Sequence, residues 1–345
     1  MRITLNKIGS VTKNVELTKR VDISPNIECK EGAILAARVL EDTELYNQLE
    51  LPSGRMSTMH KGDIIAVALG NRYALHGFAG VVPKKLAPKD VIHILSLGGV
   101  SGQCIGENLQ RVGHALKIRV IGAITRNGKN LNTYQFPEYE KENSINKTPP
   151  LIFVSGTCMN SGKTRACCEI IKRASRNKLK VAAGKVSGVA ALKDTEDMLD
   201  YGARNITSFL DCGCPSTAKI GKKVLPIAKG AIAHLAKTNP DVIILELGDG
   251  IYGEYGTMEI LKDKEIQKNT VVHIGCAQDP LGAAKLIEAS KEIGLPITAM
   301  SGPITDNEVG LEFLRKKLRT TGINAINNSK ELFAFIEPKL KNRTK

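Results

Sequence analysis

Apolar and polar positions alternate on two different length scales in the second half of the chain. Short apolar runs with the length of buried strands occur at 151–155, 180–185, 241–247, 270–276 and 296–300. Longer stretches between them have helical character, at 163–177, 227–237, 281–293 and 307–318. This alternation predicts an α/β fold in which a mostly parallel sheet has helices on both faces. Ligands of such sheets bind beyond the carboxyl ends of the strands.

The first part of the chain has a different pattern. Apolar runs at 33–40, 63–69 and 73–82 are separated by turn signals, which predicts a small β-rich module. From Val91 to Ile124, an apolar run, the glycines of Gly98-Gly99-x-x-Gly102, a helix-like stretch and a second apolar run follow one another. We interpret this order as a βαβ unit. Its glycine turn either binds an anion at a helix N-terminus or only packs helix against strand.

A polar, charged segment separates these two parts. Residues 127–150 end in Pro149-Pro150 and are typical of a linker or a long surface loop. We therefore predict a smaller N-terminal domain at 1–126, a linker at 127–150 and a larger domain at 151–345.

Composition narrows the class of protein. The chain has 345 residues, a formal net charge of +14 and 42% apolar residues, and it lacks the run of about 18 apolar residues that a membrane span needs. The N-terminal stretch has no apolar region of a secretory signal, so we expect a cytoplasmic protein without a membrane partner. The positive charge is spread along the chain and aromatic residues make up 4%, a pattern that does not favour nucleic-acid binding.

The eight cysteines do not form the pattern of a disulfide framework in a chain of this size. Cys212 and Cys214 have a spacing that could form half of a thiolate metal site. No second pair of ligands with suitable spacing follows, and a turn built from two small residues accounts for them better.

The stretch GTCMNSGKT follows the apolar run at 151–155 and precedes a helical stretch. Backbone N–H groups of such a loop can surround phosphates, Lys163 can reach the β and γ phosphates, and the Thr164 hydroxyl can bind Mg²⁺. We expect the Lys163 side chain to face solvent. The candidate nucleotide-binding residues of the loop are Gly156, Thr157, Cys158, Met159, Asn160, Ser161, Gly162, Lys163 and Thr164.

Five residues, rather than the usual four, separate Gly156 from Gly162. This spacing, with Gly156-Thr157 and Gly162-Lys163-Thr164, resembles the loop of dethiobiotin synthetase, a SIMIBI-class P-loop protein. The resemblance implies a parallel sheet, a Mg²⁺–nucleotide at the loop and, often, a homodimer or higher homo-oligomer. The chain also resembles a group of P-loop proteins that includes a D-glutamate N-acetyltransferase, whose members carry a smaller N-terminal domain.

Two further segments extend the resemblance to the synthetase. Lys185-Val186-Ser187-Gly188 is similar to a substrate-facing Lys-x-x-Gly region, although a solvated lysine before a turn explains it equally well. Residues 241–256 resemble the family's acidic strand and glycine-rich turn. The chain departs from the family at Cys158, where an aspartate is usual, and at 245–250, which read Leu-Glu-Leu-Gly-Asp-Gly.

Acidic residues provide the candidates for metal binding and catalysis. Glu246 ends an apolar run and Asp249 follows it, and a carboxylate is costly in such a place unless it serves a metal or a hydrogen bond. Asp194 could hold Mg²⁺ or cap a helix. Asp279 could read a nucleotide base or cap the helix that starts at Pro280. We take Lys163, Lys185, Glu246 and Asp249 as catalytic candidates, and Thr164, Glu246 and Asp194 as metal ligands.

These features favour an enzyme that uses ATP and Mg²⁺ to activate a small anionic metabolite, in the manner of synthetases and ligases. Two alternatives stay open at this point. One is a metal-delivery or switch NTPase, and the other is an acyltransferase whose loop holds the phosphates of coenzyme A.

Overall fold

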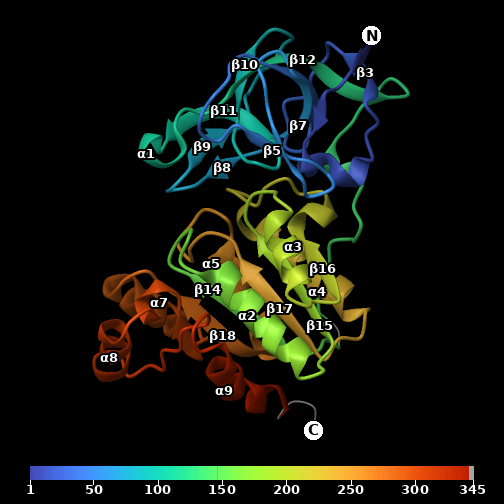
Figure 1. Ribbon diagram of the computed structural model, residues 1–345. Helices are drawn as coiled ribbons and strands as arrows, with labels where there is room; N and C mark the ends of the chain where they lie inside the picture. The colour runs from blue at the N-terminus through green and yellow to red at the C-terminus, as the bar shows by residue number, and fades with distance from the viewer. Residues whose placement is uncertain (146, 342–345) are drawn as a thin grey trace. The chain divides into compact units, whose positions relative to one another are not determined.

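The computed structural model describes residues 1–145 and 147–341, and the chain divides into two compact units (Figure 1). Residue 146 of the predicted linker and residues 342–345 of the Lys-rich C-terminal stretch lie outside the described residues. Unit 1 comprises Met1–Glu138, Val189–Lys193 and Phe209–Lys219, and unit 2 comprises Tyr139–Gly188, Asp194–Ser208 and Ile220–Lys345. Two short segments of the second half of the chain therefore belong to unit 1.

Within the described residues, the sheet of unit 2 has six strands in the order β16-β15-β17-β14-β18-β19. Every neighbouring pair is parallel, as predicted. β16 is a strand that the sequence pattern does not reveal. The bounds are β14 Leu151–Gly156, β15 Val181–Ser187, β16 Asn205–Ser208, β17 Val242–Leu247, β18 Thr270–Cys276 and β19 Ala299–Ser301.

Helices cover both faces of this sheet, which confirms the predicted fold class. Alternate side chains of β14, β17 and β18 point to one face, where they pack on α2 and α9. On the opposite face, Leu235 of α4 lies against Gly184, and Leu286 of α7 lies against Gly275. The bounds are α2 Lys163–Arg176, α3 Lys193–Asp200, η4 Gly221–Lys223, α4 Val224–Ala236, α5 Thr257–Lys262, α6 Lys264–Asn269, α7 Pro280–Glu292, η5 Pro303–Thr305, α8 Glu308–Lys316 and α9 Ser329–Lys341.

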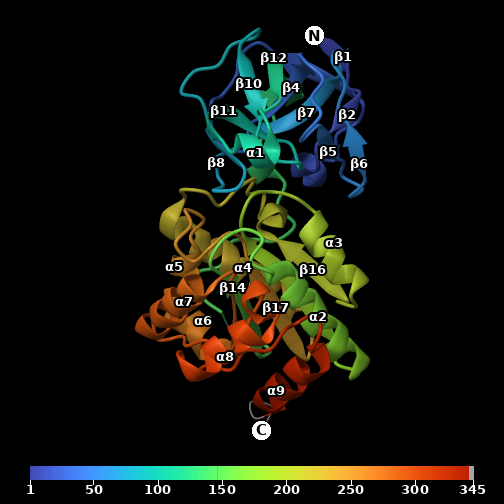
Figure 2. The same cartoon turned by 60° about the vertical axis from the view of Figure 1, so that its left-hand side comes forward.

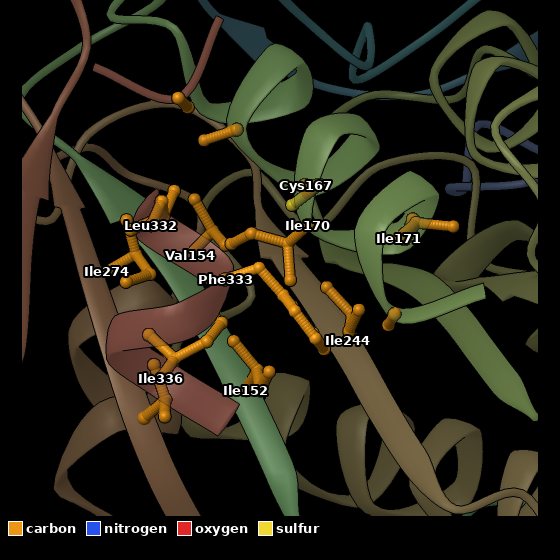
Figure 3. Close-up of a cluster of buried hydrophobic side chains, with 14 of the residues drawn as sticks. Ile152, Val154, Cys167, Ile170, Ile171, Ile244, Ile274, Leu332, Phe333 and Ile336 are labelled. Carbon is orange, nitrogen blue, oxygen red and sulfur yellow. The ribbon is translucent and has the colours of Figure 1, made fainter. Parts of the chain in front are cut away.

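Figure 3 shows the core between the sheet and α2 and α9, where Ile152, Ile170, Ile244 and Phe333 point toward one another. Each of these side chains is almost fully buried, and burying one contributes about 1.5–3 kcal/mol. This core fixes α2, and with it the loop at the N-terminus of α2. In the part of the chain that the structure describes, no helix is long and apolar enough to cross a membrane.

Unit 1 is β-rich, as predicted (Figure 2). Within the described residues, its main sheet follows the path β1-β3-β12-β4-β7-β11-β9-β8. The bounds are β1 Arg2–Thr4, β2 Lys7–Ile8, η1 Ser10–Val15, β3 Arg20–Ser24, β4 Ile34–Val39, β5 Gln48–Glu50, β6 Met56–Thr58, β7 Ile64–Leu69, β8 Arg72–Tyr73, β9 Phe78–Val81, β10 Val91–Ile94, β11 Val100–Glu107, α1 Leu109–Val112, β12 Lys117–Arg126, β13 Lys129–Asn130, η2 Thr133–Gln135 and η3 Phe209–Cys212.

The βαβ interpretation of 91–124 is wrong. β10 pairs antiparallel with both β11 and β12, and α1 has four residues. Gly99 has a φ of +91° and reverses the chain between β10 and β11, so a hairpin forms where a crossover is expected. No helix follows the glycine turn directly, and an anion therefore has no helix N-terminus to bind there.

Candidate functional site

The loop that follows β14 has the strand–loop–helix arrangement of a P-loop. β14 ends at Gly156, and α2 begins at Lys163 directly after Gly162, whose φ is +93°. A Cβ at Gly156 would overlap the Ser161 hydroxyl, so glycine is required for the loop to fold back on the strand. The Thr157 amide donates to the Cys276 carbonyl oxygen at 3.0 Å, which anchors the start of the loop to β18.

The side chain of Lys163 does not face solvent, contrary to our expectation. Lys163 is 5% exposed, and its Nζ donates to the Cys158 carbonyl oxygen at 2.7 Å and lies 3.5 Å from Ser161 Oγ. The ammonium group folds over its own loop because the loop offers oxygen acceptors there. Phosphate oxygens are acceptors of the same kind with a greater negative charge.

A cavity of about 470 Å³ opens beside this loop. Among its lining residues, Lys163, Thr164, Lys185, Asp194, Glu246 and Asp249 are predicted site residues, and Met159, Asn160 and Gly162 belong to the loop. Arg165 also lines it and is not among the predicted residues. The signal that could have revealed Arg165 is its place directly after Gly-Lys-Thr, where a basic side chain can reach the same ligand.

Glu246 lies near the end of β17 and is 2% exposed. Its Oε1 accepts a hydrogen bond from Thr164 Oγ1 at 2.9 Å, whereas its Oε2 is buried without a hydrogen-bond partner among the described residues. Burial raises the pKa of Glu246, against the opposing effect of the Lys185 ammonium. A buried carboxylate oxygen with spare acceptor capacity, next to a threonine hydroxyl, suits a hard cation such as Mg²⁺.

Lys185 and Asp194 form an ion pair across the same cavity. Burial lowers the pKa of Lys185, but the charges of Asp194 and Glu246 outweigh this effect and raise it above its ordinary value. Lys185 therefore stays charged, and part of the Asp194 charge is compensated by this partner. Of the two carboxylates, Glu246 is the one with a buried oxygen that has no hydrogen-bond partner among the described residues.

Asp249 lies in a tight glycine turn after β17. Its φ is +60°, and it lines the cavity. A Cβ at Gly248 would overlap the Ser187 carbonyl oxygen, and one at Gly250 would overlap that of Thr157. Glycines on both sides of Asp249 are therefore required for this turn to approach both β15 and the loop.

Asp279 lies apart from these groups. Its side chain caps α7 by accepting a hydrogen bond from the Gly282 amide at 2.9 Å, and it does not line the 470 Å³ cavity. The neighbouring Gln278 donates to the Met159 carbonyl oxygen at 3.3 Å. Gln278 also lines a second cavity of about 540 Å³, together with Pro303, Ile304 and Phe313.

Cys212 and Cys214 are buried in unit 1. Cys214 Sγ donates to the Ser216 carbonyl oxygen at 3.0 Å, and burial raises the pKa of this thiol to about 12. A thiol with so high a pKa is a poor metal ligand at neutral pH. Within residues 1–145 and 147–341, no group of three or more His, Cys, Asp or Glu side chains is arranged to hold a metal. Mg²⁺ at a P-loop needs fewer, because phosphates and water complete its coordination.

No protein-family model matches the chain, and no curated protein matches it in sequence. Similar solved structures include cell division protein FtsY from Thermotoga maritima, at 18% identity and a TM-score of 0.39 over 60% of this chain and 74% of that one. Hydrogenase maturation factor HypB from Archaeoglobus fulgidus matches at 16% identity and a TM-score of 0.38, over 56% and 90% of the two chains.

The signal recognition particle 54 kDa protein from Aeropyrum pernix K1, solved in complex with GDP, matches at 14% identity and a TM-score of 0.38, over 61% and 52% of the chains. With TM-scores below 0.5, these likenesses identify neither a family nor an activity for this chain.

Proposed function

We propose that unit 2 is a P-loop enzyme of the SIMIBI class that uses Mg²⁺–ATP to activate a small anionic metabolite. One observation carries this proposal: Lys163, Thr164 and the spare oxygen of Glu246 converge on one cavity at the N-terminus of α2. A phosphate loop needs a mobile cation, a metal-binding hydroxyl and a carboxylate in this arrangement.

Each group has a distinct role in this proposal. Thr164 and Glu246 hold Mg²⁺, which offsets the negative charge of the phosphates when it is bound. Lys163 exchanges the Cys158 carbonyl oxygen for phosphate oxygens. Lys185, kept charged by Asp194, contributes a positive charge where the transferred phosphoryl group meets an anionic substrate. Asp249 can orient the attacking group from the turn after β17.

Measurement of phosphate release distinguishes this function from the acyltransferase alternative. An ATP-using enzyme of this kind releases inorganic phosphate in the presence of its substrate, whereas an acyltransferase that binds coenzyme A does not. The buried thiols of Cys212 and Cys214 do not favour metal delivery. A comparison of ATP with GTP in the same assay decides the nucleotide.

The first prediction concerns Lys163. Replacing Lys163 by alanine removes the charge that meets the phosphates, so we expect the Kd for Mg²⁺–ATP in calorimetry to rise by about tenfold or more, which is about 1.4 kcal/mol. Lys172→Ala is the matched control, because Lys172 also lies on α2 and forms an ion pair with Glu169. Since Lys163 is buried, circular dichroism must show that both variants are folded. Equal affinity of folded Lys163→Ala and the unaltered protein would refute the proposed site.

A further inference from the structure

The cavity of about 540 Å³ in unit 2 has no role in the proposed function. The start of α7, the 3-10 helix η5 and α8 form its walls, and α7 and α8 lie side by side (Figures 1 and 2). All of its lining residues belong to unit 2, and none of them lines the 470 Å³ cavity beside the phosphate loop. Its volume is in the range of pockets that bind small molecules. We call it the second cavity.

One face of α8 forms a wall of the second cavity. Val309, Phe313, Lys316 and Lys317 line it. They are spaced as i, i+4, i+7 and i+8, which places them on one side of a helix. Leu314 is fully buried, so a different side of α8 packs on the rest of unit 2. The wall that α8 presents to the cavity is therefore apolar at its start and basic at its end.

The apolar end of the second cavity is open to solvent. Val309 is 79% exposed, although it lies on the same face of α8 as Phe313. Pro280 of α7, with Pro303 and Ile304 of η5, completes the apolar lining. Apolar surface that a ligand covers is removed from water, which favours binding of a ligand with an apolar body.

The other end of the second cavity is positively charged. Lys316 forms an ion pair with Glu312, which also lines the cavity. Lys317 also lines it and forms no ion pair within residues 1–145 and 147–341. The lining therefore carries one positive charge that no carboxylate compensates. A single charge suits a monoanion, whereas a bound phosphate usually meets several backbone N–H groups and cations.

Backbone contacts separate the second cavity from the phosphate loop. Gln278 lines the second cavity, and its Nε2 donates to the carbonyl oxygen of Met159, which lines the other cavity. Gly302, directly before Pro303, lies so close to the loop that a Cβ there would overlap the Ser161 carbonyl oxygen. A ligand in the second cavity can therefore be bound at the same time as a nucleotide at the phosphate loop.

We infer that the second cavity is a binding site for a small carboxylate with an apolar body, separate from the nucleotide site. The apolar wall around Val309 and Phe313 takes the body, and Lys317 meets the carboxylate. This inference does not rest on the proposed function, because it requires neither nucleotide nor turnover. An adenine ring is the competing occupant, and the experiment distinguishes it.

The test uses three probes that vary the body and the charge separately. Octanoate has both features, octylammonium has the body with the opposite charge, and acetate has the carboxylate without the body. Binding is measured by ligand-observed NMR titration below the critical micelle concentration. We expect octanoate to bind at one saturable site with a Kd about tenfold or more below that of octylammonium, because one charge is attracted to Lys317 and the other repelled. Acetate should not bind measurably.

Two matched variants locate the site. Val309→Asp places a carboxylate in the apolar wall, so the Kd for octanoate should rise about tenfold or more. Leu281→Asp is the control, because Leu281 is 82% exposed, is also the second residue of its helix and does not line the second cavity. An aspartate is favourable in the first turn of a helix, so both variants should fold. Lys317→Gln should remove most of the preference for octanoate over octylammonium.

Competition with nucleotide completes the test. Saturating Mg²⁺–ATP should leave the Kd for octanoate unchanged within about twofold, since the two cavities share no lining residue. Displacement of octanoate by ATP would show that the second cavity belongs to the nucleotide site and would overturn the inference. It would also be overturned if octanoate does not bind saturably, if octylammonium binds as tightly, or if Val309→Asp and Leu281→Asp weaken octanoate binding equally.

Discussion

At the scale of single residues, a variant of Glu246 tests whether this carboxylate acts in nucleotide binding or in the chemical step. Glu246→Gln keeps the shape of the side chain and a hydrogen bond to Thr164 but removes the charge at the spare oxygen. We expect nucleotide to bind still and turnover to fall by roughly a hundredfold, on the order of 3 kcal/mol of lost transition-state stabilisation. Steady-state phosphate release and the melting temperature should be measured on the same preparation.

Asp249→Asn is the companion variant, because Asp249 lines the same cavity. Asp249→Asn should lower turnover more than Glu246→Gln only if Asp249, and not Glu246, is the carboxylate closer to the reacting group. A purely structural role for either residue predicts a lower melting temperature with near-normal turnover of the folded protein. Full activity in both variants would show that neither carboxylate takes part in catalysis.

The sequence reveals residues that carry a local signal and misses those whose partners are distant in the chain, for a physical reason. Lys163 and Thr164 lie in a local motif, and Glu246 ends an apolar run where a charge is costly, so short windows of sequence single them out. Glu50, a buried carboxylate of unit 1, has no such local signal. Its partner Leu192 is 142 positions away, and only the folded backbone brings the two together.

At the scale of elements, the pattern predicts central strands and amphipathic helices best. β18 has the predicted bounds, 270–276, and α2 differs from its prediction by one residue at its end. The pattern does not predict β16, because its four residues contain no long apolar run. The β10–β11 hairpin is mistaken for a crossover because a glycine pair marks a turn without showing which way the chain leaves it.

His273 links elements of the parallel sheet and gives an element-scale prediction. It lies on β18, its Nε2 is 2.7 Å from Ser155 Oγ on β14, and its Nδ1 is 3.0 Å from the Leu295 carbonyl oxygen. The Leu295 carbonyl oxygen can only accept a hydrogen bond, so Nδ1–H donates to it and Nε2 accepts a hydrogen bond from the Ser155 hydroxyl. Burial lowers the pKa of His273 from its ordinary 6.5 to about 4, and the folded protein therefore holds this histidine neutral.

The sign of the effect on stability follows from this shift. Between pH 6.5 and pH 4 the unfolded chain binds the proton more readily, so the free energy of unfolding should decrease as the pH falls through this range. We expect a loss of about 2 kcal/mol from this group between pH 7 and pH 5, measured by urea denaturation. His273→Gln should remove this contribution. His60→Gln, at an exposed histidine, should keep it, and an equal pH dependence of the His273→Gln and His60→Gln variants would contradict the assignment.

At the scale of the whole molecule, the chain passes from unit 1 to unit 2 after Glu138, and the linker at 127–150 stays a prediction. The pattern does not reveal that 189–193 and 209–219 belong to unit 1. Both segments resemble ordinary loops between elements of the second half, since their partners lie far away in the sequence. Ala190, Leu192 and Leu210 are buried because of unit 1 residues, so a fragment that begins near residue 139 would expose them.

This division predicts the outcome of limited proteolysis. Residues 140–144 form an exposed stretch at the unit boundary, so trypsin should cut first after Lys141 or after the exposed Lys147. The two products should stay together in gel filtration under native conditions, because unit 1 still holds 189–193 and 209–219 from the second product. They should separate only in denaturant. A first cut inside β14–β19 would show that the boundary between the units is wrong. Separation of the products without denaturant would show that the packing of 189–193 and 209–219 does not hold the two products together.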